Sequence, residues 1–187
     1  MKAKPTADER QPFLTDIQEL RRRAREHMEL GAVTSGYKAD RETVIKILND
    51  VVATEIVCVL RYKRHYYMAT GIHAQSVAQE FLEHAAEEQV HADLAAERIV
   101  QLGGEPDLNP AGLATRSNTQ YIEGTTLVEM IQENLVAERI GVESYGEIIR
   151  YLGNDDPTTR IMIETFLAKE EEHAEDMKTL LESIGKQ

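Results

Sequence analysis

The sequence has few aromatic residues, one cysteine and no long run of uncharged apolar residues. Aromatic side chains make up 5% of its 187 residues and tryptophan is absent, so helix-forming residues dominate the composition. The single cysteine, Cys58, excludes an internal disulfide and a cysteine-based metal site, and it fits a reducing cytoplasm. With no apolar segment of secretory or membrane-spanning type, we expect neither export by that route nor membrane insertion.

Positive charge is also scarce. The chain has 21 Lys and Arg against 33 Asp and Glu, which gives a net charge of -12. This balance argues against nucleic-acid binding by the whole surface and suits a protein that attracts and holds cations. The length predicts one domain, large enough to bury a substantial core.

A Glu-x-x-His motif occurs twice, and a lone glutamate precedes each motif at nearly the same distance. Residues three apart lie on one face of a helix, so each motif can offer a carboxylate and an imidazole to one cation. This repeat has the ligand composition of a dinuclear carboxylate site inside a four-helix bundle. The predicted metal ligands are Glu55, Glu88 and His91 in the first half and Glu138, Glu170 and His173 in the second.

Apolar residues at helical spacing predict an all-α fold with four long helices. The short turns between the first two helices and between the last two make each pair antiparallel. The link between the second and third helices is long enough, at about 3.3 Å per residue, to cross the length of a helix, so these two should run parallel. The expected helices cover residues 40–69, 73–102, 125–152 and 157–184, and the crossover covers residues 103–124.

The first 39 residues are expected to lie outside the bundle, so we divide the chain into residues 1–39 and 40–187. A loose tail precedes an amphipathic helix over residues 13–30, where Thr15 and Gln18 have capping-box spacing. We interpret its basic residues as a solvated face; the alternative is a basic arm for DNA or for a neighbouring subunit. These residues are Arg21, Arg22, Arg23 and Arg25.

Four carboxylates that converge in a bundle core would repel one another, because burying an isolated carboxylate costs several kcal/mol. They must therefore take up protons, pair with basic side chains or bind cations. The apolar faces offer no Arg or Lys near the level of the glutamates. Four carboxylates and two imidazoles match two divalent transition metals, and they favour iron or manganese over calcium or a structural zinc.

Residues 40–184 resemble the ferritin-like family, and the ligand spacing is most similar to bacterioferritin. The resemblance implies that Glu55 and His91 are terminal ligands of one iron and that Glu138 and His173 serve the other. It also implies oxidation of Fe²⁺ by O₂ or H₂O₂ and storage of Fe³⁺ inside a hollow shell. The remaining roles that it implies are bridging by Glu88 and Glu170, and hydrogen bonding or electron donation by Tyr62.

Two departures from bacterioferritin change what we expect. That family places a haem-binding methionine directly after the bridging glutamate of the second helix, where this chain has Gln89, so we expect no haem there. The residues after His173 complete the fourth helix and leave no room for the fifth helix of 24-subunit cages. We therefore expect a shell of 12 subunits, as in Dps proteins, although Dps proteins usually build their iron site between subunits.

Other functions remain open at this point. A peroxide-removing di-metal enzyme, like rubrerythrin or manganese catalase, shares the bundle, although Cys58 alone cannot supply the paired cysteines of rubrerythrin. A Dps-type protein that shields DNA with its Arg-rich helix is a further alternative. His65 and His84 could be transient iron sites, but we expect both to have core or surface roles, and we expect Cys58 to be a core residue.

Overall fold

The computed structural model describes residues 16–72 and 74–185, and the chain separates into two compact units, Met1–Tyr37 and Lys38–Gln187. In the first unit, the helix α1 (Ile17–Arg23) is followed by the 3₁₀ turn η2 (Met28–Leu30). The prediction of one helix up to Leu30 is therefore wrong, because His27 takes a left-handed backbone conformation with φ 51° that interrupts it. Residues 13–15 lie outside the described residues, and the treatment of residues 1–39 as a separate domain stays a prediction.

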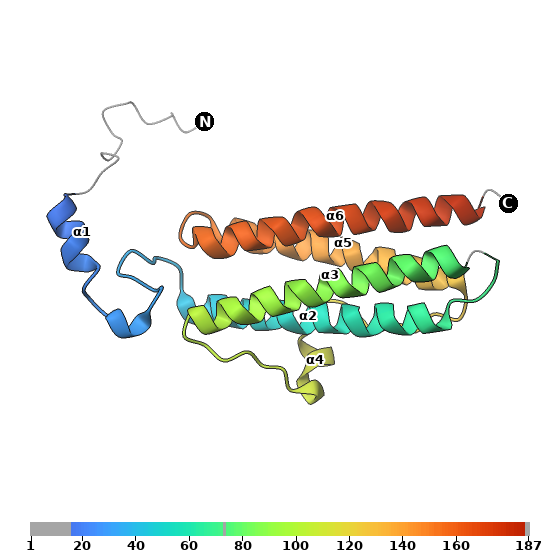
Figure 1. Ribbon diagram of the computed structural model, residues 1–187, viewed down its shortest axis with the longest axis horizontal. Coiled ribbons are helices and arrows are strands. Elements are labelled where there is room, and N and C mark those ends of the chain that lie inside the picture. Colours follow the sequence, from blue (N-terminus) through green and yellow to red (C-terminus); the bar gives the residue numbers. More distant parts are fainter. Residues whose placement is uncertain (1–15, 73, 186–187) are drawn as a thin grey trace, which may run out of the picture. The chain divides into compact units, whose positions relative to one another are not determined.

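The second unit is built from four long helices, which lie side by side in Figure 1. Their antiparallel pairs, α2 with α3 and α5 with α6, make the most extensive contacts. This arrangement confirms the predicted all-α four-helix bundle, and the described residues contain no strand. The helices are α2 (Arg41–Met68), α3 (Ala74–Gln101), α5 (Leu127–Leu152) and α6 (Pro157–Gly185).

Side-chain caps start three of these helices where the sequence predicts. Asp40 accepts hydrogen bonds from the backbone at the start of α2, and Thr126 and Glu129 form a reciprocal capping box on α5. At α6, the carboxylate of Asp156 accepts a hydrogen bond of 2.9 Å from the backbone nitrogen of Thr159. Each cap satisfies amide groups that the first turn of a helix leaves without partners.

The crossover runs along α2 from its first turns to its last. Arg116 donates a hydrogen bond of 2.9 Å to the carbonyl of Asn49 near the start of α2, and a ring nitrogen of His65 near its end lies 3.1 Å from the carbonyl of Ile122. This path makes α3 and α5 parallel, as predicted. The short helix α4 (Pro110–Arg116) within the crossover was not predicted, although Asn109 followed by Pro110 is a typical start of a helix.

Apolar residues from all four long helices meet in the core, which includes Tyr62, Phe81, Ile131 and Met177. No helix in the described part of the chain is long and apolar enough to cross a membrane. The buried polar residues include all six predicted ligands.

Candidate metal centre

The four long helices bring the six predicted ligands together in the interior of the bundle, and all six are buried. Their donor atoms form two groups of four side chains, and within each group the atoms lie within 4.8 Å of one another. Glu88 and Glu170 belong to both groups. The first group adds Glu55 and His91, and the second adds Glu138 and His173.

Glu88 lies between the two histidines. Its Oε2 is 3.3 Å from Nδ1 of His91, and its Oε1 is 3.5 Å from Nδ1 of His173. Each imidazole also faces the glutamates of its own group. Nδ1 of His91 is 3.6 Å from Glu55 and 3.3 Å from Glu170, and Nδ1 of His173 is 3.5 Å from Glu138.

These separations are longer than ordinary hydrogen bonds, which measure about 2.7–3.2 Å between heavy atoms. Seven buried atoms of the cluster that could bind a metal have no hydrogen-bond partner among the described residues. Atoms about 2.1 Å from a shared cation would themselves be about 3–4 Å apart, which matches the spacing found here. The atoms are Oε2 of Glu55, both carboxylate oxygens of Glu88, Nδ1 of His91, Oε2 of Glu138, Oε1 of Glu170 and Nδ1 of His173.

No Lys or Arg among the described residues forms an ion pair with these four glutamates. Arg61 is a buried basic residue of α2 that we did not expect from the sequence. Its guanidinium donates to Asn134 at 2.9 Å and to the carbonyl of Gln120 at 3.1 Å, so its hydrogen bonds fix the crossover. The glutamates are thus left to be compensated by protons or metal ions.

Protons compensate part of this charge in the metal-free site. Burial raises the pKa of Glu55 and of Glu170 well above the usual range, and the neighbouring Glu88 adds to both shifts. Burial lowers the pKa of His173, but the carboxylates of Glu138 and Glu88 outweigh burial and raise it to about 11. Metal ions must displace protons from these groups, since metals bind deprotonated ligands.

A further carboxylate orients His173. Its Nε2 donates a hydrogen bond of 2.7 Å to Oε2 of Glu87, which also pairs with Lys169. This bond fixes the ring so that Nδ1 faces Glu88 and Glu138, which is the usual arrangement around a metal-binding histidine. Sequence reasoning missed Glu87, because one more half-buried glutamate on a Glu-rich helix gives no signal of its own.

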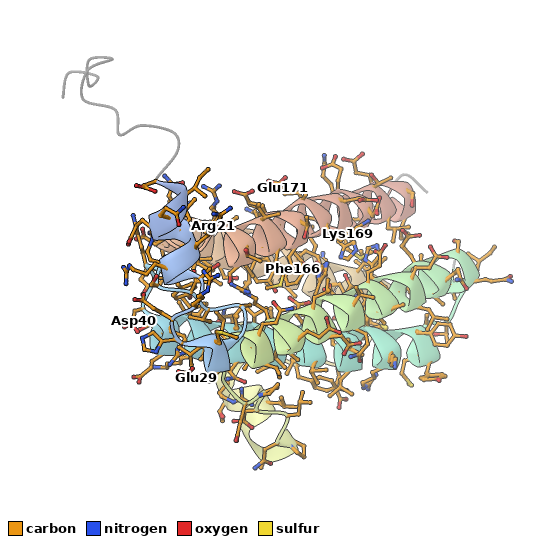
Figure 2. All side chains as sticks on the ribbon, turned by 60° about the vertical axis from the view of Figure 1, so that its left-hand side comes forward. Arg21, Glu29, Asp40, Phe166, Lys169 and Glu171 are labelled. Carbon is orange, nitrogen blue, oxygen red and sulfur yellow. The ribbon has the colours of Figure 1, made fainter. Side chains whose placement is uncertain are left out.

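Aromatic side chains pack against the other histidine and its surroundings. Phe166 lies on the inward side of α6, as Figure 2 shows, while Glu171 lies on the opposite side. The ring of Phe166 stacks on the ring of His91, with centroids 4.3 Å apart and an angle of 25° between the planes. This packing restricts the orientation of the His91 ring.

Tyr62 donates a hydrogen bond from its hydroxyl to Oε1 of Glu138, and the same hydroxyl oxygen lies 3.2 Å from Nδ1 of His84. Burial, together with Glu138 and Glu88, raises the pKa of Tyr62 well above the usual value, so the phenol keeps its proton. Tyr145 occupies the equivalent position two turns after Glu138, but its buried hydroxyl has no hydrogen-bond partner. The two halves of the site are therefore not equivalent.

A ferritin-like domain model matches residues 45–186, which include the whole cluster. The chain belongs to the ferritin-like family. Among curated relatives, a bacterioferritin of Brucella melitensis is 30% identical over 76% of this chain and 85% of its own length. A DNA protection during starvation protein of Pyrococcus furiosus is 28% identical over 76% of this chain and 78% of its own.

Solved structures give the same result for this ferritin-like chain. A dodecameric thioferritin of Bacteroides fragilis, described as related to bacterioferritin, superposes with a TM-score of 0.77 at 32% identity. The match covers 80% of this chain and 90% of that one. A Dps protein of Thermosynechococcus elongatus, at 22% identity and a TM-score of 0.72, shares the fold.

Gly141 leaves room for the side chain of Glu170 in this ferritin-like bundle. A Cβ atom at this position would lie 3.1 Å from both Cγ and Oε2 of Glu170. Such a contact is tighter than normal packing allows, so a side chain here would displace the Glu170 carboxylate. The requirement was not foreseen, because a glycine within a helix gives no indication of what it faces.

Three further residues considered from the sequence, His65, Cys58 and Gln89, do not belong to the two groups of clustered ligand atoms. His65 is buried, and its ring nitrogens lie 3.2 Å from Asn134 and 3.1 Å from the carbonyl of Ile122, which gives it a core role. Cys58 is buried against Thr119, in agreement with a core role. Gln89 donates to Asp93 on the side of α3, and the absence of haem at this position stays a prediction.

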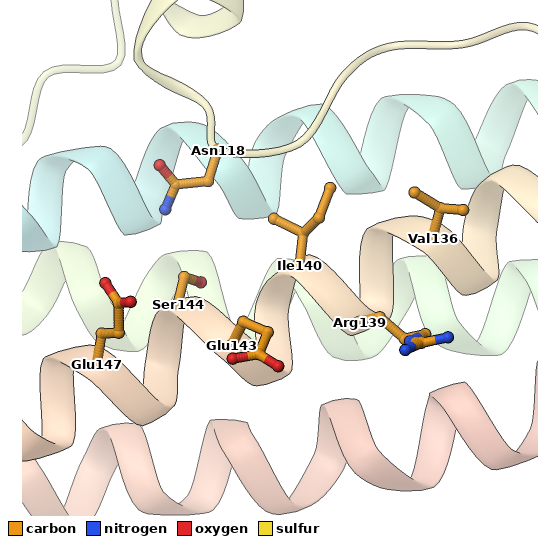
Figure 3. Close-up of a pocket in the computed structure, with 7 residues that line it drawn as sticks. All are labelled: Asn118, Val136, Arg139, Ile140, Glu143, Ser144 and Glu147. Atoms are coloured by element: carbon orange, nitrogen blue, oxygen red, sulfur yellow. The ribbon is translucent and has the colours of Figure 1, made fainter.

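A hollow of about 610 Å³ lies elsewhere, on α5 with Asn118 of the crossover at its edge (Figure 3). Its lining includes Val136, Ile140 and Ser144, and none of the six clustered side chains lines it. The buried cluster, unlike this hollow, offers closely spaced ligand atoms to small ions.

Proposed function

We propose that this chain oxidises Fe²⁺ at an intrasubunit dinuclear site and stores the resulting Fe³⁺. Membership of a family with bacterioferritin relatives supports iron storage and ferroxidase activity in general terms. The observation that carries the specific proposal is the set of seven buried donor atoms without hydrogen-bond partners, arranged as two groups that share two carboxylates. Their spacing and composition fit two divalent transition metals.

Each side chain takes a role that its position supports. Glu55 and His91 would hold one Fe²⁺, Glu138 and His173 would hold the other, and Glu88 and Glu170, which belong to both groups, would serve both ions. Glu87 keeps His173 in the required tautomer, and Tyr62 orients the Glu138 carboxylate. Each Fe²⁺ gives up one electron, so a pair, together with two protons from solvent, reduces O₂ to H₂O₂, or H₂O₂ to two molecules of water.

Storage requires an enclosed volume, which a side-chain-filled bundle does not offer. We therefore propose a closed shell of 12 chains. The similarity to the dodecameric thioferritin of Bacteroides fragilis supports this number. Native mass spectrometry should give a mass near twelve times 21.1 kDa, and a mass near twenty-four times that value, or a dimer as the largest species, contradicts the shell proposed here.

The replacement of Glu88 by Gln tests the dinuclear site directly. Glu88→Gln keeps the volume but removes the carboxylate that faces both histidines. We expect rapid Fe²⁺ oxidation to fall by about a hundredfold or more, with helicity unchanged. The control is Glu83→Gln, an exposed position on the same helix; if both variants oxidise Fe²⁺ at the parent rate, the assignment is wrong.

The ion pairs of α1 support DNA shielding less than they support a solvated helix face. Arg22 forms ion pairs with Glu19 and Glu26, and Arg23 lies 3.6 Å from Glu19. These acidic partners neutralise part of the basic face. An electrophoretic mobility shift assay at several salt concentrations, with and without residues 1–30, checks this alternative.

Manganese is the second metal that the donor set admits, and a manganese-dependent peroxide-removing enzyme would use the same six residues. Anomalous scattering recorded at the iron and manganese edges of protein purified from its native source decides between them. Manganese at both positions, together with rapid release of O₂ from H₂O₂, would replace the ferroxidase proposal.

A further inference from the structure

A third group of possible metal ligands lies outside the six-residue cluster, where α3 faces α6. It consists of Glu80 and His84 from α3 and Asp176 from α6, with one donor atom of each within 4.8 Å of the others. The imidazole is buried, with 2% of His84 exposed, whereas the side chains of Glu80 and Asp176 are 35% and 43% exposed. The group thus extends from the surface into the core.

The hydrogen bonds of Tyr62 determine which nitrogen of His84 is free to bind an ion. The phenol proton of Tyr62 is donated to Glu138, so the phenol oxygen accepts from Nδ1–H of His84. In neutral imidazole the other nitrogen, Nε2, then carries a lone pair. A hydrogen bond that fixes the second ring nitrogen is the usual support of a metal-binding histidine.

Nε2 of His84 points at the two carboxylates without a hydrogen bond to either. It lies 3.5 Å from Oε1 of Glu80 and 3.6 Å from Oδ2 of Asp176. These distances exceed the ordinary hydrogen-bond range, and they match the spacing of donors around a common cation. No Lys or Arg within the described ranges pairs with either carboxylate, so two negative charges share one neutral imidazole.

The position of His84 connects this group to the dinuclear cluster. Its ring stacks on the ring of His173, with centroids 3.8 Å apart and 17° between the planes. It also contacts Tyr62, which is bonded to Glu138. A cation held by His84 is therefore separated from the inner ligands by little more than one imidazole ring.

We propose that Glu80, His84 and Asp176 form a third divalent-cation site, which binds Fe²⁺ from solution before the ion reaches the dinuclear centre. One imidazole and two carboxylates carry a charge that neutralises a divalent ion, and water completes its coordination. Mixed nitrogen and oxygen ligands suit Fe²⁺, Mn²⁺ or Zn²⁺ better than Ca²⁺. The site departs from the packing role that the sequence suggests for His84, and its delivery role rests on the proposed function whereas ion binding does not.

Crystals of the metal-free full chain, soaked in Zn²⁺ and measured on both sides of its absorption edge, test ion binding. We expect three anomalous peaks per chain, with the third between Glu80, His84 and Asp176. The double variant Glu80→Gln, Asp176→Asn should retain two peaks and lose the third. Among the described residues, these two carboxylates form ion pairs with His84 and with none of the six inner ligands. No peak at the third position in the parent, or a third peak that persists in the variant, overturns the proposal.

The matched control is the double variant Glu83→Gln, Glu175→Gln. It removes the same charge from the same two helices, but Glu83 accepts from Gln79 and Glu175 pairs with Lys178, outside the group. This control should keep all three peaks. If it also loses the third peak, overall charge rather than direct ligation explains the binding and the proposal fails.

The rate of Fe²⁺ oxidation at limiting Fe²⁺ tests the delivery role. We expect the Glu80, Asp176 variant to be about tenfold slower than the parent and the control to match the parent. A variant as fast as the parent overturns delivery. A parent that does not oxidise Fe²⁺ overturns the proposed function and delivery together, while the anomalous maps still decide whether the third ion binds.

Discussion

The hydroxyl of Tyr62 on α2 donates a hydrogen bond to the carboxylate of Glu138 on α5, and this bond links the two halves of the bundle at the cluster of predicted ligands. The equivalent tyrosine of the second half, Tyr145, has a buried hydroxyl without a partner. A sequence repeat has thus given two tyrosines with different surroundings. The difference provides a matched pair of variants.

We expect Tyr62→Phe to weaken Co²⁺ binding by about tenfold, because the carboxylate of Glu138 loses the group that orients it. Tyr145→Phe removes a hydroxyl that bonds to nothing, so binding should stay within about twofold of the parent. Spectroscopic titration with Co²⁺ measures both. Equal losses in the two variants would contradict an orienting role for Tyr62.

Gly141 provides a second test of ligand placement. Gly141→Ala puts a methyl group 3.1 Å from the carboxylate of Glu170, and we expect metal binding and Fe²⁺ oxidation to fall by about tenfold or more. Helicity should be retained, since alanine favours a helix more than glycine does. Circular dichroism and stopped-flow oxidation measure the two effects.

Gly146→Ala on the same helix is the control for this variant. Its Cβ would meet the flexible end of the Arg150 side chain at 3.3 Å, which can move away. We expect it to stabilise the protein by up to about 1 kcal/mol and to oxidise Fe²⁺ at the parent rate. Normal activity in Gly141→Ala would show that Glu170 needs no glycine beside it.

The sequence predicts the bundle and the six clustered residues because both follow from helical periodicity. A carboxylate such as Glu55 on an otherwise apolar face is visible without a structure. Features that depend on contacts between distant segments are not visible in this way. Arg61 donates a hydrogen bond to the crossover, and Glu80 and Asp176 lie on different helices. The helical pattern of a single segment predicts neither this hydrogen bond nor the group formed by Glu80, His84 and Asp176.

Two predictions from local sequence patterns, the length of the N-terminal helix and the absence of a helix in the crossover, were wrong. The apolar spacing of residues 13–30 favours one continuous helix, but the backbone turns at His27 and the helix ends at Arg23. The helix α4 was not predicted because its seven residues are too few to show a helical period of apolar residues. Both errors lie outside the four long helices that hold the site.

Asp156 provides a test of stability against pH. Its carboxylate caps α6 and lies 3.0 Å from the guanidinium of Arg98. Burial raises the pKa of Asp156, but its bonds to Thr159 and Arg98 outweigh burial and lower it below the usual 3.8. Because the folded pKa is lower than the unfolded pKa, this stabilisation is present above about pH 4 and is lost as the pH falls through the folded value.

We therefore expect Asp156→Asn to reduce the free energy of unfolding by about 1–3 kcal/mol at pH 7, and the deficit should shrink steadily below about pH 4. Chemical denaturation at a series of pH values measures it. The control is Asp155→Asn, an exposed neighbour with the same change in charge, which should be nearly neutral. A deficit that grows on acidification would reverse the assigned sign.

Removal of metal should show that the cluster is maintained for function at a cost in stability. Without metal, Glu55 is buried against Glu88, and burial and this neighbour raise its pKa. Holding a proton on Glu55 at neutral pH costs free energy, and Glu55→Gln removes this cost at nearly equal volume. We therefore expect the metal-free variant to unfold at the same temperature as the metal-free parent or a few degrees above it.

Metal should reverse this order. At a free Co²⁺ concentration of about one hundred times the dissociation constant, binding stabilises the parent by about 2.7 kcal/mol, or about 5–10 °C in Tm. Glu55→Gln lacks one donor of the first group and should gain less than half of that shift, and a chelator should return each protein to its metal-free Tm. Differential scanning calorimetry with and without Co²⁺ measures the four values. A metal-free variant that melts well below the metal-free parent would mean that Glu55 stabilises the fold by itself, and an equal gain from Co²⁺ in both proteins would remove Glu55 from the ligand set.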